Sequence, residues 1–309
     1  MKEKLMKIVF LAAACVSIVI IVIMCLFLFG SGIPTIKEIG VFDFLFGKVW
    51  SPGNNTYGIL PFIMGSIYVT IGAIIVGVPI GLLTAIYMAK FCNSKLYRII
   101  KPAVNLMAGI PSIVYGFFGL WVIVPIMREL FGGGGKSILT ASVLLGIMIL
   151  PTIINTAETS IRAVPESYYE GSLALGATHE RSVFVAVVPA AKSGILAGVI
   201  LGIGRAIGET MALIMIAGNQ TVMPTSIFNG VRTLTGNIVM EIGYATDLHR
   251  DALIATGVVL FVFILIINSL FSLVNKKESD TSKTKKLSLR KKHKAPESIT
   301  GQAVERLGE

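Results

Sequence analysis

Six stretches of this 309-residue chain are apolar over the length needed to cross a lipid bilayer. A spanning helix needs about 20 predominantly apolar residues. The six stretches cover residues 8–29, 61–89, 103–127, 137–157, 193–217 and 251–275. Backbone N–H and C=O groups find no water inside a bilayer, so such segments form helices that satisfy these groups internally. The chain is therefore predicted to be an all-α membrane protein with six transmembrane helices.

The overall composition excludes an ordinary soluble domain. Hydrophobic residues make up 54% of the chain and charged residues only 14%, and soluble domains carry about 25% charged residues. The first apolar stretch, 8–29, is too long for the core of a signal peptide and is not followed by an A-x-A cleavage pattern. We expect it to be retained as a membrane span.

Basic residues indicate the orientation of the chain. Most Lys and Arg residues lie in the amino-terminal segment, in the loops 90–101 and 158–192, and in the carboxy-terminal tail. Such residues collect on the cytoplasmic side. We therefore expect a multi-pass protein of the prokaryotic plasma membrane with both termini in the cytoplasm. The net charge of +10 is then a topology signal, and no nucleic-acid partner is predicted.

These patterns divide the chain into four parts. Residues 1–30 are predicted to form an amino-terminal transmembrane helix, 31–60 an extracytoplasmic loop, and 61–275 a core with five transmembrane helices. Residues 276–309 form a basic tail that is expected to be disordered on the cytoplasmic side. Its lysines should be attracted to anionic membrane lipid, by about 1 kcal/mol for each basic residue near the surface.

Arg205 and Glu209 are charged residues inside the fifth apolar stretch. Ionised groups are costly within a membrane and usually mark a transport path or a buried pair. On a continuous helix they lie within about 60° of Gly194, on the same face as Gly198 and Gly202. Small residues at this spacing allow another helix to approach closely. The pair is therefore predicted to face the interior of the bundle.

Two further segments contain signals for breaks and turns. Pro111 lies within the third apolar stretch, where it either breaks the helix or only kinks it. In the loop 158–192, Pro165 and Glu166 favour the start of a helix and Gly176 favours its end. We expect a short helix over about 165–175, followed by a second helix that reaches Val188.

No catalytic, metal or cofactor site is predicted. The three cysteines and three histidines lack metal-ligand spacing. Gly132–Ser137 resembles a phosphate-binding loop, but Leu130 stands where the motif requires its first glycine. The chain is therefore expected to be a non-enzyme that does not hydrolyse ATP itself.

The loop after the fourth apolar stretch resembles a known family. Glu170, Gly171, Ser172 and Gly176, followed by Val188-Pro189, are similar to the EAA loop of ABC-importer permeases. This copy has Glu-Gly-Ser where the motif has Glu-Ala-Ala. In that family the loop forms a cytoplasmic coupling helix that docks onto an ATPase subunit. The resemblance therefore implies the MetI-like permease fold and assigns these four residues to ATPase coupling.

Three other segments narrow the resemblance to phosphate-importer permeases. They are Gly204–Thr210, Gly109–Leu120 and Trp50–Pro52. Tyr57–Ser66 is closer to the PstC type than to the PstA type. The resemblance implies four kinds of partner, which are a PstA-like second permease, two ATP-binding subunits, an extracytoplasmic phosphate-binding protein and inorganic phosphate.

The chemistry of Arg205 agrees with this expectation. Its planar guanidinium matches phosphate oxygens in bidentate geometry and stays charged at any relevant pH. Our hypothesis is that Arg205 exchanges Glu209 for a passing phosphate, with Thr210 as a further hydroxyl donor. Three alternatives stay open at this stage, namely an ion pair that only braces the bundle, a path for sulfate or molybdate, and a membrane scaffold that transports nothing.

Overall fold

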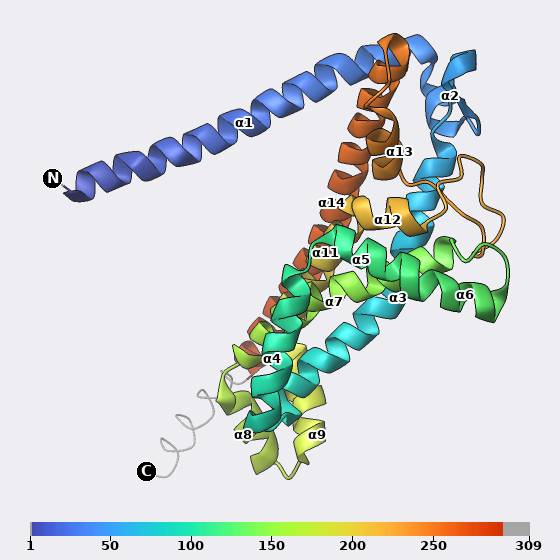
Figure 1. Cartoon of the computed structure of the whole chain (residues 1–309). Coiled ribbons are helices and arrows are strands. Elements are labelled where there is room, and N and C mark those ends of the chain that lie inside the picture. Colours follow the sequence, from blue (N-terminus) through green and yellow to red (C-terminus); the bar gives the residue numbers. More distant parts are fainter. Residues whose placement is uncertain (1, 293–309) are drawn as a thin grey trace, which may run out of the picture. The chain divides into compact units, whose positions relative to one another are not determined.

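The computed structural model describes residues 2–292 and the side chains of residues 4–269. This part of the chain is almost entirely helical (Figure 1). The first of two compact units extends to Leu265, and the second begins at Ile266. The elements are α1 Lys2–Ile39, α2 Val41–Phe46, β1 Trp50–Ser51, η1 Pro52–Asn54, β2 Thr56–Tyr57, α3 Leu60–Ile86, η2 Tyr87–Phe91, α4 Ser94–Gly109, α5 Ser112–Phe118, η3 Gly119–Ile123, α6 Val124–Phe131, α7 Ile138–Arg162, α8 Glu166–Ala174, α9 His179–Ser182, η4 Val183–Val187, α10 Val188–Ala190, α11 Lys192–Gly208, α12 Met211–Ile216, α13 Leu234–Glu241 and α14 Asp247–Lys292.

Five helical segments in the described part are long and apolar enough to cross a membrane. A sixth span is possible if two helices that meet at a bend of 70°, His179–Ala190 and Lys192–Gly208, count as one. The five are Lys4–Ile39, Leu60–Phe91, Ser112–Phe131, Ile138–Arg162 and Asp247–Ser269. The predicted all-α membrane fold is therefore confirmed.

The third predicted span was placed wrongly at its start. We expected one span over 103–127, but α4 ends at Gly109 and the spanning helix starts at Ser112. Ile110 and Pro111 between them are extended, with ψ angles of 126° and 141°. Proline lacks an N–H and pushes the preceding residue out of the helical region. Of the two alternatives left open at Pro111, a break or a kink, the structure has the break.

The ends of the first and last helices differ from the expected boundaries. α1 continues past residue 30 to Ile39, and the segment predicted as a loop over 31–60 contains α2 and the β1–β2 hairpin as well. α14 continues past residue 276 to Lys292. The remainder of the predicted tail, 293–309, lies outside the described residues.

Helix α7 packs closely between α3 and α11 (Figure 1). On the α3 side, a Cβ atom at Gly77 would lie only 2.8 Å from the carbonyl oxygen of Gly146. On the α11 side, a Cβ atom at Gly198 would lie 3.0 Å from Thr156. The expected small-residue face of residues 194–202 is therefore the face that meets α7.

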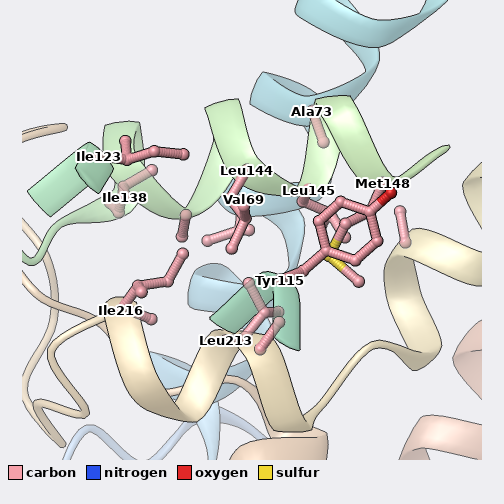
Figure 2. Packing of buried hydrophobic residues seen from close by; sticks show 14 of the residues in the cluster. Val69, Ala73, Tyr115, Ile123, Ile138, Leu144, Leu145, Met148, Leu213 and Ile216 are labelled. Carbon is pink, nitrogen blue, oxygen red and sulfur yellow. The ribbon is translucent and has the colours of Figure 1, made fainter. Parts of the chain in front are cut away.

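The largest buried cluster surrounds the first half of α7. Figure 2 shows side chains of this cluster from several elements pointing toward one another. They include Val69 and Ala73 of α3, Tyr115 of α5, Leu144, Leu145 and Met148 of α7, and Leu213 and Ile216 of α12. This core joins the two short helices, α5 and α12, to the long helices α3 and α7.

A second cluster fixes the β1–β2 hairpin. Buried Glu241 accepts a hydrogen bond from Trp50 Nε1 at 2.8 Å, is paired with Arg232, and lies 2.9 Å from His249 Nε2. The rings of Trp50 and Tyr57 meet edge to face at 5.5 Å, and burial raises the pKa of Tyr57. The hairpin is thereby held against the segment 232–249, far away in the sequence.

The close approach of α3 to α7 generates a stability prediction. Gly77→Ala should lower the free energy of unfolding by about 1–3 kcal/mol, because the added methyl group overlaps the α7 backbone. Gly30→Ala is the matched control, since an added Cβ there meets no described atom within 4 Å. Alanine should stabilise that helix by up to about 1 kcal/mol. Thermal unfolding of the detergent-solubilised protein measures both, and equal destabilisation would contradict the packing.

Candidate functional site

Arg205 lies in the last turn of α11 and points toward α7. Its side chain is half-buried, and Nη1 donates a long hydrogen bond of 3.4 Å to Thr152 Oγ1 on α7. Within the described side chains Arg205 forms no ion pair with a carboxylate. Its guanidinium therefore has N–H donors that form no hydrogen bond within the described residues.

Glu209 does not continue the helix that carries Arg205. The expected continuous helix over 193–217 is wrong, because α11 ends at Gly208 and Glu209 is extended, with ψ 131°. Residues four apart face each other only on an unbroken helix. Glu209 Oε1 instead accepts the backbone N–H groups of Thr210 and Ala212, at 3.2 and 3.3 Å. It caps the start of α12.

Thr210 lies in the same break. Its hydroxyl group donates to the carbonyl oxygen of Gly208 at 3.2 Å, and its side chain is half-buried. The neighbouring backbone is held as well, because Thr235 donates to the carbonyl oxygen of Glu209 at 3.2 Å. The three predicted path residues therefore share one short segment, but only Arg205 is directed at α7.

The second break, at Ile110 and Pro111, is tied to the same region. The helices that follow the two breaks, α5 and α12, pack against each other. A Cβ atom at Gly116 would lie 3.1 Å from the Cα atom of Ala212. The Tyr115 hydroxyl donates to the carbonyl oxygen of Met107 at 2.9 Å, across the break. The two interrupted helices are thus joined through α5 and α12, and α12 directly follows the break at Glu209.

The predicted short helix in the loop 158–192 is confirmed as α8. It runs from Glu166 to Ala174, with Pro165 directly before it and no buried residue along it. Gly176 has a φ of +83°, a conformation that glycine adopts without strain at a helix end. Glu170 and Gly171 are exposed, and Ser172 is half-buried. Leu175 at the end of α8 is 90% exposed.

Contacts on the inner side of α8 hold it in place. The Tyr169 hydroxyl lies 2.7 Å from His179 Nδ1, and Lys90 Nζ lies 3.2 Å from Glu166 Oε2. The His179 ring also meets Phe91 edge to face at 4.8 Å. Roles for Tyr169, His179 and Thr152 could not be predicted from the sequence, because their partners lie on separate elements. α8 is thus an anchored helix with an open outer face.

The two sites suit different tasks. The guanidinium at the breaks offers hydrogen-bond donors to an anion, and the outer face of α8 offers a surface to another protein. Within the described residues, no group of three His, Cys, Asp or Glu side chains could hold a metal ion.

Comparison with known proteins shows which family shares these features. Residues 77–280 match the family model described as "Binding-protein-dependent transport system inner membrane component". The "Probable ABC transporter permease protein YqgH" of Bacillus subtilis is 37% identical, over 84% of this chain and 88% of its own length. The "Phosphate transport system permease protein PstC" of Mesorhizobium japonicum is 34% identical, over 83% and 84% of the two chains.

Solved structures share the fold. A chain of the MetNI methionine ABC transporter in an inward-facing conformation superposes with a TM-score of 0.54 at 20% identity, covering 71% of this chain and 94% of that one. A bacterial ABC transporter involved in alginate import gives a TM-score of 0.53 at 12% identity, covering 71% and 79%. The predicted MetI-like permease fold is confirmed. The chain belongs to the family of binding-protein-dependent ABC-transporter inner membrane components.

Proposed function

We propose that this permease subunit forms half of the translocation path of an ATP-driven importer of inorganic phosphate. The observation that carries the proposal is the position of Arg205, whose guanidinium lies in the last turn before a helix break and has no carboxylate partner among the described side chains. Arginine binds phosphate oxygens through its planar fork. The names of the PstC relatives, at 30–34% identity, support phosphate as the anion.

The roles of the three path residues follow from their contacts. Arg205 binds the ion, and the half-buried hydroxyl group of Thr210 supplies a further donor. Glu209 keeps a negative charge in the break, which opposes tight binding and so favours release. The hypothesis that Arg205 exchanges Glu209 for phosphate requires an initial ion pair between these two residues. In this structure they form none, because the Glu209 side chain caps α12.

Coupling to ATP hydrolysis is assigned to α8 and the turn after it. Glu170, Gly171, Ser172 and Gly176 form the outer part of this segment, which ends on the exposed Leu175. A separate ATP-binding subunit docks here and hydrolyses the nucleotide. The complete importer then contains this chain, a PstA-like second permease, two ATP-binding subunits and an extracytoplasmic phosphate-binding protein. Both termini of this chain, and α8, face the cytoplasm.

Replacing Arg205 tests the path. Arg205→Gln should lower the initial rate of phosphate uptake by about tenfold or more, because a hydrogen bond to a charged group contributes roughly 1.5–3 kcal/mol. Arg205→Lys should retain part of the rate, since lysine keeps the charge but not the fork. Uptake of labelled phosphate by proteoliposomes with the whole complex gives these rates. Arg250→Gln, an exposed arginine on α14, is the control.

The same assay separates the alternatives. Normal uptake in Arg205→Gln would refute the path role. Failure of assembly in both Arg205→Gln and Glu209→Gln would favour a bracing role. Uptake of labelled sulfate or molybdate by the same proteoliposomes, without uptake of labelled phosphate, would assign another oxyanion. A wild-type complex that transports none of the three would favour a scaffold.

Crosslinking tests the coupling segment. In a background without Cys15, Cys25 and Cys92, Gly171→Cys and Leu175→Cys should each crosslink to the ATP-binding subunit, because both positions are exposed. Leu130→Cys on α6, which is 67% exposed, should not. Gel analysis of the oxidised complex detects the product. The assignment fails if no cysteine between Glu170 and Gly176 gives one.

A further inference from the structure

A buried carboxylate near the end of α7 joins three segments of the chain. Glu158 is only 1% exposed. Its Oε1 accepts hydrogen bonds from the Tyr97 hydroxyl at 2.8 Å and from Arg162 Nε at 2.7 Å, and its Oε2 accepts from Lys101 Nζ at 2.6 Å. Arg162 also donates to the carbonyl oxygen of Met88 at 2.7 Å. Glu158 thus ties α7 to α4 and, through Arg162, to η2.

Two side chains of α4 donate hydrogen bonds to Glu158, and one of them donates a further hydrogen bond to α7. Tyr97 and Lys101 are one helical turn apart, so they hold one face of α4 against α7. Lys101 donates a second bond, to Asn155 Oδ1 at 2.9 Å, and the Arg162 guanidinium stacks over the Tyr97 ring at 4.5 Å. The hydrogen bond to Glu158 raises the pKa of Tyr97. The phenol therefore stays a donor over the physiological range.

Such a cluster is not needed for tight packing alone. Buried ion pairs can often be replaced by apolar side chains without loss of stability. What the carboxylate adds is a fixed register between two helices, because its two oxygens accept from defined positions on each.

The elements on either side of Glu158 are the two functional segments. Toward the carboxy terminus, α7 ends at Arg162, and Pro165 leads directly into α8. On the other side, α4 runs from Lys101 to the break at Ile110 and Pro111, where Met107 is bonded to Tyr115. A cavity of about 740 Å³ lies along this stretch, lined by Lys101, Asn105, Gly109 and Pro111 among others.

We propose that Glu158 is a positioning residue for transport, which makes α4 move together with the end of α7 and with α8. A displacement of α8 by the ATP-binding subunit then reaches the break next to Tyr115 and Arg205 through α4. This inference rests on the proposed function of α8 as the coupling segment. Without the carboxylate, α8 moves but α4 does not follow.

The first test measures coupling in the complete transporter complex in proteoliposomes. Glu158→Gln should leave assembly and ATP hydrolysis near wild-type levels, while phosphate transported per ATP falls by about tenfold or more. The double variant Glu158→Gln with Lys101→Gln should regain part of the ratio, because two amides can form a neutral hydrogen bond between the helices. Glu129→Gln, an exposed carboxylate on α6, is the control.

The second test does not depend on the transported ion. Spin labels at Arg98→Cys on α4 and Ser167→Cys in the first turn of α8, both exposed positions outside Glu170–Gly176, report the distance between the two helices with and without ATP. In the cysteine-free complex with native Glu158 the distance should stay single and unchanged. With Glu158→Gln it should broaden or shift when ATP binds.

The outcomes separate this inference from the proposed function. An unchanged transport-to-ATP ratio and an unchanged distance in Glu158→Gln would overturn the positioning role. Loss of assembly in both Glu158 variants would also overturn it, in favour of a role in folding. A wild-type complex that moves no phosphate contradicts the proposed substrate, whereas the distance measurement still decides the role of Glu158.

Discussion

The structure depends on the close approach of three helix backbones at α7. Glycines on α3 and α11 leave space into which the residues of α7 fit, at separations that a β-carbon would not allow. Between membrane helices such contact is stabilised by dispersion forces and not by exclusion of water. Because α7 is held on both sides, it sets the positions of the elements attached to it. These are the core around Tyr115 at one end, and Glu158 and α8 at the other.

Two helix breaks beside this rigid group create the polar site. A break within a membrane leaves N–H and C=O groups that need partners in the protein or in water. Here Glu209 accepts two of the freed N–H groups, while Tyr115 and Thr235 donate to carbonyl oxygens near the two breaks. The charged side chain that the sequence suggests as a partner for Arg205 is thus engaged with the backbone. The guanidinium is left with a neutral hydroxyl neighbour.

Features that depend on local backbone chemistry could be predicted from the sequence. Pro111 predicts a break, and Pro165 together with Gly176 predicts α8, because both residue types restrict or permit particular backbone angles. The break at Glu209 could also have been recognised, since a glycine followed by a capping residue is a helix-end signal. The apolar run around it favoured a continuous helix instead. The Glu158 cluster could not be predicted, because its partners on α4 lie 57 and 61 residues away.

The neutral neighbour of Arg205 has a consequence for protons. A guanidinium remains charged throughout the pH range in which cells live, and the hydroxyl group of Thr152 does not titrate there. Under the proposed role, the arrival of an anion at Arg205 requires no protein group at this contact to take up or release a proton. The guanidinium and the hydroxyl group at this contact would then carry the same charge before and after the ion arrives. Any sensitivity of this contact to acidity would originate in the ion and its own protonation state.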